Sequence, residues 1–128
     1  MFIEYNPNPV ARRVGDCAVR AITKALGTDW DTAYCLLVTA GFSLKDMPSS
    51  NPVWGSVLKD NGFRREAVRS DCEECYTAGD FCKDHPVGTY VLGFDSHTAT
   101  VVDGNLWDSW DSSGEYPQYY WVKETDDV

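Results

Sequence analysis

The sequence predicts an α+β fold in which helices come first and an antiparallel sheet packs on the first of them. Apolar residues recur at helical spacing in the first half of the chain, and short runs of β-branched and aromatic residues follow in the second half. The pair Asp103-Gly104 is the strongest hairpin signal in the chain. A length of 128 residues is enough for one domain with its own core, so we expect residues 1–128 to form a single domain.

The first half of the chain predicts three helices after an irregular segment over 1–14, which contains an Asn-Pro-Asn-Pro turn. Each predicted helix has an apolar stripe at helical spacing, a capping residue at its start and a glycine that ends it. The helices are expected over 17–26, 28–40 and 51–61, with caps at Asp16, Thr28 and Asn51 and glycines at 27, 41 and 62. A shorter helix should begin at Thr77 and bury Phe81 and Cys82.

Four strands are expected in the second half, over 89–94, 97–102, 105–110 and 116–122. A two-residue turn at 103–104 makes Ala99 face Asp108, so that His97 and Asp108 become diagonal neighbours with Cα atoms about 7–8 Å apart. Alternation along the two strands places six residues on one face: His97, Ala99, Val101, Leu106, Asp108 and Trp110. A bulged three-residue turn would bring Asp111 to His97 instead, so Asp111 is the alternative partner.

The predicted neighbours His97 and Asp108 are the residue types that acid–base chemistry uses. A carboxylate beside a histidine fixes the tautomer of the imidazole and stabilises the imidazolium once a proton has been taken. The alternative interpretation is a histidine and an aspartate on a hairpin surface with no partner, and spacing alone leaves both interpretations open.

Cys17 follows Gly15-Asp16 directly at the start of the first predicted helix. Unpaired backbone N–H groups and the helix dipole favour a thiolate there, and the same N–H groups can bind an oxyanion. A histidine from a facing strand would activate the sulfur. The alternative is a small buried hydrophobic residue, which free cysteine often is. Cys35 lies in the middle of the second predicted helix, away from any such positive end, and is expected to be a packing residue.

Residues 72–85 read CEECYTAGDFCKDH and form a second constellation. Cys72, Cys75, Cys82 and His85 have the spacing C-x2-C-x6-C-x2-H, and three thiolates with one imidazole can hold zinc tetrahedrally. The six-residue gap is shorter than the gap in common zinc fingers. We therefore expect plain thiols and no cofactor, with the zinc set and a Cys72–Cys75 disulfide or redox pair as alternatives.

The charge and the composition of the chain exclude several partners. A net charge of -9 makes nucleic acid and anionic membranes poor partners. The N-terminal segment has no apolar signal-peptide region, and no run approaches the roughly 18 apolar residues of a membrane span. We therefore expect a protein of the reducing cytoplasm, in which its five cysteines are thiols, ligands or nucleophiles and not disulfides.

Three stretches of the chain together resemble the papain-like cysteine peptidases: GDCAVRAITKALG, DHPVGTYVLGFDSHTATVVDGNLWDSWDSS and YYWVK. The order Cys-His-Asp and the H-x5-DG-x3-D hairpin carry the resemblance, which is to a group of small papain-fold proteins encoded by phages and gut bacteria. It implies a papain-like fold, with a catalytic cysteine at a helix start packed on a C-terminal antiparallel sheet. For a phage-encoded member the compartment would be the cytoplasm of the host cell.

The resemblance also implies a function. Cys17 would be the nucleophile, His97 the general base and acid, and Asp108 the residue that orients His97. The expected reaction is hydrolysis of an amide or isopeptide bond in a peptide or protein substrate. The alternative is a catalytically weak or inactive papain-fold binding module, such as a phage protein that binds a host factor.

One position departs from the family pattern. Papain relatives usually have an oxyanion-hole glutamine six residues before the cysteine, and this chain has Ala11 there. We assign Asn8 as the side-chain donor in its place, and Asp16 as a further oxyanion or substrate contact. Without such a donor the backbone N–H of Cys17 would act alone, and the loss of one donor typically costs about 100- to 1000-fold in rate.

Overall fold

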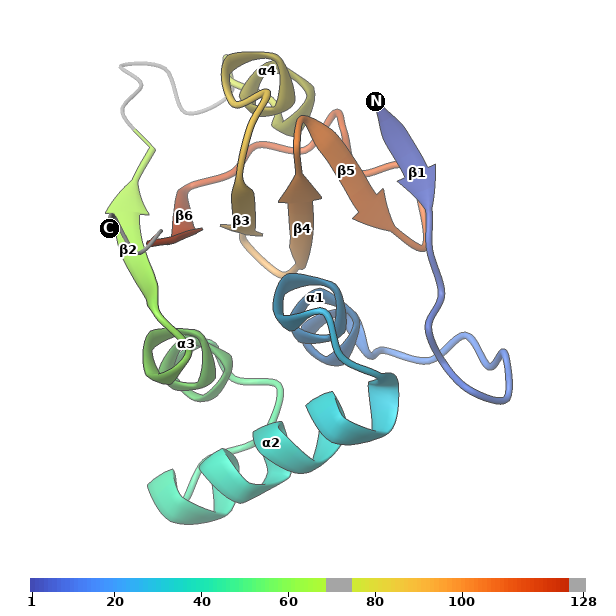
Figure 1. Ribbon diagram of the computed structural model, residues 1–128, viewed down its shortest axis with the longest axis vertical. Coiled ribbons are helices and arrows are strands. Elements are labelled where there is room, and N and C mark those ends of the chain that lie inside the picture. The colour runs from blue at the N-terminus through green and yellow to red at the C-terminus, as the bar shows by residue number, and fades with distance from the viewer. Residues whose placement is uncertain (69–74, 125–128) are drawn as a thin grey trace.

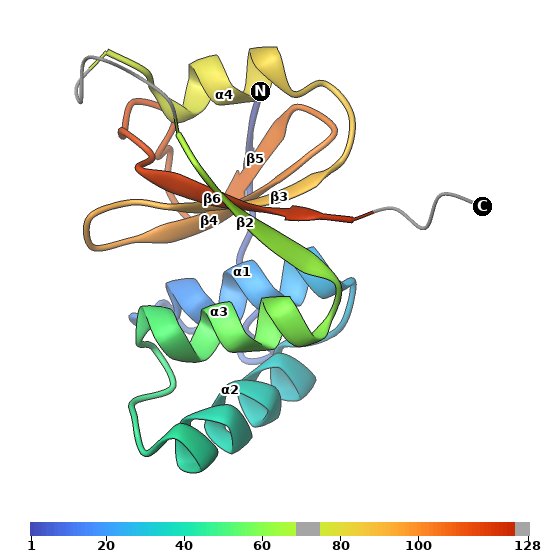
Figure 2. The same ribbon diagram turned by 90° about the vertical axis from the view of Figure 1, so that its left-hand side faces the viewer.

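The fold is a mixed sheet with helices on both faces (Figure 1), as the computed structural model describes it over residues 1–68 and 75–124. Within these residues, four helices pack on a six-stranded sheet whose strand order is β1-β5-β4-β3-β6-β2. Figure 2 shows α4 above the sheet, α1 and α3 side by side below it, and α2 beyond them. In chain order the elements are β1 (Phe2–Glu4), α1 (Cys17–Leu26), α2 (Trp30–Leu44), α3 (Asn51–Asp60), β2 (Phe63–Ala67), α4 (Ala78–Asp84), β3 (Thr89–Gly93), β4 (Thr98–Val102), β5 (Asn105–Asp108) and β6 (Tyr119–Lys123).

Helix α1 begins and ends where its sequence predicts. Cys17 is its first residue, and Gly27 ends it in the left-handed conformation with φ 64°. Seven of its residues are buried because α1 lies between the sheet and α2, with α3 at its side (Figure 2). The predicted α+β class and the predicted first helix are therefore confirmed.

The caps of α2 and α3 differ from those expected. Asp29 caps α2 by accepting a hydrogen bond from the backbone N–H of Thr32 at 2.7 Å, so Thr28 is not the cap. Helix α3 is preceded by Ser50, which places Asn51 inside the helix as its first residue. At the start of α4, Thr77 and Asp80 form the expected cap as a reciprocal capping box.

Gly41 does not end α2, which continues to Leu44 and stops at Lys45 with φ 57°. The glycine is required for another reason. A Cβ at position 41 would lie 2.8 Å from the carbonyl oxygen of Asp46 and 3.3 Å from the backbone nitrogen of Pro48, because the chain turns back across the helix there.

We expect Gly41→Ala to lower the free energy of unfolding by about 1–3 kcal/mol, because the added methyl group overpacks this crossing. Helix propensity alone has the opposite sign, since alanine is favoured over glycine by about 1 kcal/mol in a helix. Urea denaturation of the variant measures the difference. Gly114→Ala is the control, because no atom would meet a Cβ at Gly114 within 4 Å. A Gly41→Ala protein at least as stable as the parent would contradict the expectation.

The hairpin of β4 and β5 has the predicted register. Val101 pairs with Leu106 and Val102 with Asn105. Asp103 and Gly104 have φ values of 49° and 77°, so both central residues of the turn are left-handed. This is the conformation that an Asp-Gly pair favours in a two-residue hairpin.

Two further strands complete the sheet. Residues 1–14 are not wholly irregular, because β1 pairs in parallel with β5 at one side of the sheet. At the opposite edge, β2 pairs with β6, and Arg64 and Arg65 lie on this exposed edge strand. Such charged residues protect an open edge from pairing with other chains. In the described part of the chain, no helix is long and apolar enough to cross a membrane.

Candidate active site

The candidate site lies at one end of the central strands of the sheet, where the N-terminus of α1 meets the turn between β3 and β4. Cys17 is the first residue of α1 and is partly exposed. His97 directly precedes β4, and Asp108 is the last residue of β5. The structure brings these three side chains together, although Cys17 and His97 are far apart in the sequence.

The thiol of Cys17 lies in an environment that favours its charged form. Burial by itself raises the pKa of Cys17. A hydrogen bond with His97, the charge of His97, a backbone hydrogen bond from Thr98 and the charge of Arg20 act in the other direction. Together they hold the pKa of Cys17 below its ordinary value of 9.0.

His97 connects the thiol to a buried carboxylate. Its Nε2 lies 2.6 Å from Oδ2 of Asp108, which leaves Nδ1 as the ring nitrogen for Cys17. The ring is held between Phe94 and Trp110, with centroid distances of 5.7 and 4.9 Å. Burial lowers the pKa of His97, but the hydrogen bonds and charges of Asp108 and Cys17 outweigh it and raise the pKa to about 9.

Asp108 is fully buried and its carboxylate is saturated with hydrogen bonds. Besides His97, Oδ2 accepts a hydrogen bond from the hydroxyl of Ser112 at 2.7 Å. Oδ1 accepts from the backbone N–H of Ser109 at 2.7 Å and from the guanidinium of Arg20 at 2.9 and 3.1 Å. Burial raises the pKa of Asp108, but these donors outweigh it and the pKa is lowered, so the group is a carboxylate.

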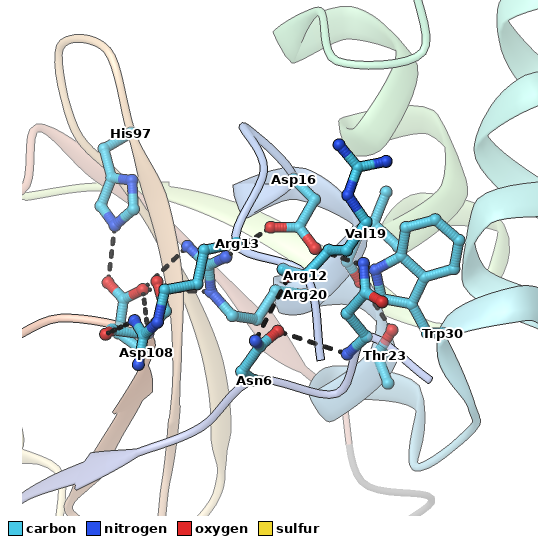
Figure 3. Close-up of polar contacts among 12 residues, drawn as sticks. Asn6, Arg12, Arg13, Asp16, Val19, Arg20, Thr23, Trp30, His97 and Asp108 are labelled. Carbon is cyan, nitrogen blue, oxygen red and sulfur yellow. Dashed lines mark hydrogen bonds and ion pairs between the residues drawn. The ribbon is translucent and has the colours of Figure 1, made fainter. Parts of the chain in front are cut away.

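Arg20 ties the start of α1 to this carboxylate (Figure 3). Its guanidinium bonds Asp108 on one side and Oδ1 of Asp16 at 2.8 Å on the other. Oδ2 of Asp16 accepts a further hydrogen bond from the indole N–H of Trp30 at 2.9 Å. Arg20 and Asp16 are only 5% and 6% exposed, so the pair is desolvated and neither charge has water as an alternative partner.

Two of the expected site residues have other roles. The side chain of Asp16 makes no capping hydrogen bond to α1 and is occupied by Arg20 and Trp30, so its carboxylate is not free to contact a substrate or an oxyanion. The amide oxygen of Asn8 accepts from the backbone N–H of Val10 at 3.0 Å within the turn. This bond does not involve the amide NH2 group that would donate to an oxyanion, so the assignment of Asn8 stays a prediction. Asp111 is exposed and accepts from the backbone N–H of Ser113, so Asp108 and not Asp111 is the partner of His97.

The face on which the hairpin residues lie also needs correction. Ala99, Val101 and Leu106 form a core with α4, on the side of the sheet opposite α1. The residue that meets α1 is Thr100, whose hydroxyl donates to the carbonyl of Ala21 at 2.8 Å. His97 and Asp108 reach the start of α1 because they lie at the same end of two adjacent strands.

The cysteine-rich segment is described only in part. Cys72 lies outside the described residues, and Cys75 is disulfide-bonded, not the plain thiol that was expected. Cys82 is buried on α4, and Nδ1 of His85 lies 2.8 Å from the carbonyl oxygen of Phe81. Among residues 1–68 and 75–124, no group of three or more His, Cys, Asp or Glu side chains could hold a metal ion. The zinc set as a whole stays untested.

Cys35 is exposed on α2, so the expectation that it is a packing residue was wrong. Sequence reasoning also missed Arg20 and Ser112, which complete the surroundings of Asp108. The spacing of Asp16 and Arg20, four residues apart on one helix, is a signal that would have identified their ion pair. No comparable local signal exists for Ser112.

The arrangement contains the parts that nucleophilic chemistry requires. A thiol of lowered pKa stands at a helix N-terminus, where backbone N–H groups point outward. A histidine with a raised pKa can hold the proton of that thiol, and a buried carboxylate stabilises the resulting imidazolium.

Comparison of the chain with protein-family models, with curated proteins and with solved structures gave no match. A function for this site therefore rests on its own geometry and chemistry.

Proposed function

We propose that the chain is a papain-like cysteine hydrolase that cleaves an amide or isopeptide bond of a peptide or protein. The single observation that carries the proposal is the position of His97, between the thiol of Cys17 and the buried carboxylate of Asp108. A histidine that only packed in the core would need no second hydrogen bond to a thiol at a helix start.

The proposed reaction has two steps. In the first, the thiolate of Cys17 attacks the carbonyl carbon, the C–N bond breaks, and the departing amine takes a proton from His97 to leave a thioester. In the second, His97 takes a proton from a water whose oxygen attacks the thioester carbon, and the C–S bond breaks to restore the thiolate. The backbone N–H of Cys17 is the proposed donor to the oxyanion in both steps.

A binding module is the second candidate function. It is favoured by the apolar side chains that α2 exposes on its outer surface, among which Phe42 and Leu44 are 76% and 52% exposed. Exposed apolar patches commonly mark interaction surfaces. In this case the three site residues would form a hydrogen-bonded cluster without turnover.

The pH dependence of alkylation by iodoacetamide tests whether Cys17 and His97 share a proton, which the hydrolase requires. We expect Cys17 to react at pH values below those at which an ordinary thiol reacts, because its pKa is lowered. In His97→Ala the profile should move to higher pH, since the hydrogen bond and the charge of His97 are lost. The quantity to measure is the pH at the midpoint of the alkylation profile. The alkylation rate alone changes little, because a thiol of lower pKa is also a weaker nucleophile.

Peptide mass spectrometry reads each cysteine separately, so the exposed free thiol of Cys35 is an internal reference in the same sample. The profile of Cys35 should be identical in both proteins. If the profile of Cys17 does not move in His97→Ala, the two side chains do not share a proton and the hydrolase proposal fails. Partner capture would then be the next experiment.

A further inference from the structure

A groove runs between α3 and the β6–β2 end of the sheet, on the same side of the sheet as α1. Its volume is about 430 Å³, and its lining includes Asn51, Gly55, Lys59, Arg65, Tyr119 and Trp121. We infer that this groove binds an acidic side chain of the substrate, a few residues from the bond that Cys17 attacks. This inference names the substrate class of the proposed hydrolase and therefore rests on that proposal.

The floor of the groove is aromatic. Trp121 lies directly against α3, since a Cβ at Gly55 would be 3.0 Å from Cζ2 of the indole. Tyr119 is stacked on Trp54 from α3 with ring centroids 6.1 Å apart. Both Tyr119 and Trp121 are only partly buried, so the groove offers apolar surface to the stem of a side chain.

The charge of the groove is positive in a chain whose net charge is -9. Lys59 and Arg65 are its two charged residues, and none of its lining residues is acidic. The guanidinium of Arg65 lies over the ring of Tyr119 at 4.2 Å. Within the described residues neither cation forms an ion pair, whereas the neighbouring Arg64 is paired with Glu66 and Glu124. A carboxylate is the complement of such a pair of free cations.

The neighbouring groove on the other side of α3 serves as a comparison. It has a volume of about 540 Å³ and lies between α2 and α3. Its charged residue is Asp60, and no lysine or arginine lines it. The positive charge therefore belongs to the groove at the sheet and is not a general property of α3.

The strand register connects this groove to the candidate active site. Gly93 pairs with Thr98 on one side and with Tyr119 on the other, and Thr98 directly follows His97. Tyr119 is thus two strand spacings, about 10 Å, from Thr98 at the same end of the central strands. The ring of Tyr119 lies across Gly93, where a Cβ would clash with it, so the aromatic floor extends onto β3 beside the site.

These distances define where the acidic residue belongs. An extended peptide advances about 3.3 Å per residue, so about three residues reach from the scissile bond to Tyr119. Arg65 is on the next strand beyond Tyr119, and its side chain reaches back over that ring. We therefore assign the acidic side chain to a position two to five residues from the scissile bond.

The test uses peptide vinyl sulfones that alkylate Cys17. At each position from two to five residues from the reactive group, matched probes carry Glu, Gln or Lys. The second-order rate constant for labelling of Cys17 is measured by mass spectrometry. At one of these positions we expect Glu to exceed Lys by about threefold to tenfold, because exposed charge pairs have modest energies. The preference should shrink in high salt, which screens exposed charges.

Charge reversal in the groove supplies the controls. Arg65→Glu and Lys59→Glu should abolish or invert the preference for Glu. Lys83→Glu makes the same change of net charge on α4, across the sheet, and should leave the preference intact. Equal labelling by all three probes overturns the inference, as does a preference for Glu that survives Arg65→Glu.

Failure of this inference differs from failure of the proposed function. Iodoacetamide alkylation of the same proteins reports the pH profile of Cys17 without using the groove. If the alkylation profile of Cys17 depends on His97 but the probes label the protein equally or not at all, only the acidic subsite is overturned. A profile that does not depend on His97 overturns the hydrolase, and with it the substrate class.

Discussion

Arg20→Met is expected to lower the free energy of unfolding by about 3–5 kcal/mol, which is the usual cost of breaking a buried ion pair by removal of one partner. The guanidinium bonds two carboxylates that are almost or fully buried, those of Asp16 and Asp108. Methionine fills a similar volume, but it leaves Asp16 without a cation and Asp108 with His97 as its remaining cationic partner, in a place that water does not reach. Domains of this size have a total stability of only about 5–15 kcal/mol, so the loss would be a large fraction of it.

Denaturation in urea, followed by tryptophan fluorescence, measures this loss. Arg13→Met is the matched control, because Arg13 pairs with Glu4 at the same distance of 2.8 Å but the two side chains are 64% and 68% exposed. The control should change stability by less than about 1 kcal/mol. Equal losses of stability in Arg20→Met and Arg13→Met would mean that burial does not determine how much the Arg20 ion pair stabilises the protein. Arg20→Lys keeps the positive charge, so its free energy of unfolding should lie between those of the methionine variant and the parent.

Asp108→Asn should lower the pKa of His97 from about 9 toward its ordinary value of 6.5. Asparagine keeps the shape of the side chain but removes the negative charge that stabilises the imidazolium. At pH 8 a group of pKa 9 is about 90% protonated, and a full return to 6.5 would leave about 3%. Cys17 then loses its cationic partner, and its alkylation profile should move to higher pH.

The titration is read directly from the imidazole resonances in an NMR spectrum. The chain has two histidines, so one further variant, His85→Gln, assigns both signals. Asp111→Asn is the control, because Asp111 is also an aspartate near the end of β5 but bonds Ser113 and not His97. A midpoint that stays near 9 in Asp108→Asn, or that moves equally in both variants, would contradict the geometry of the site.

Local signals predicted those parts of the fold that local chemistry decides. Gly27 ends the first helix, and Asp103-Gly104 determined the register that brings His97 to Asp108, whereas the expected capping bond of Asp16 does not form. Each of these depends on residues close together in the chain. The sequence alone therefore led to the same three candidate site residues that the structure brings together.

Features that depend on distant partners could not be predicted in this way. Strand β1 has only three residues and is stabilised by pairing with β5, about a hundred residues later. Alternation identified residues that share a face of the hairpin, but it does not reveal whether α1 or α4 covers that face. Arg20 lies on α1, which is buried on nearly all sides. The helical periodicity of α1 therefore did not distinguish Arg20 from its apolar neighbours.

The position of Cys17 in the chain has a consequence for synthesis of the protein. Translation proceeds from the N-terminus at about 5–20 residues per second, so Cys17 leaves the ribosome several seconds before the β4–β5 hairpin is complete. Until then the thiol lacks the imidazole that acts on it, and helix α1 lacks the strands that cover it. The nascent chain therefore carries an ordinary cysteine, and the pKa of Cys17 is lowered only when β4 has docked on α1.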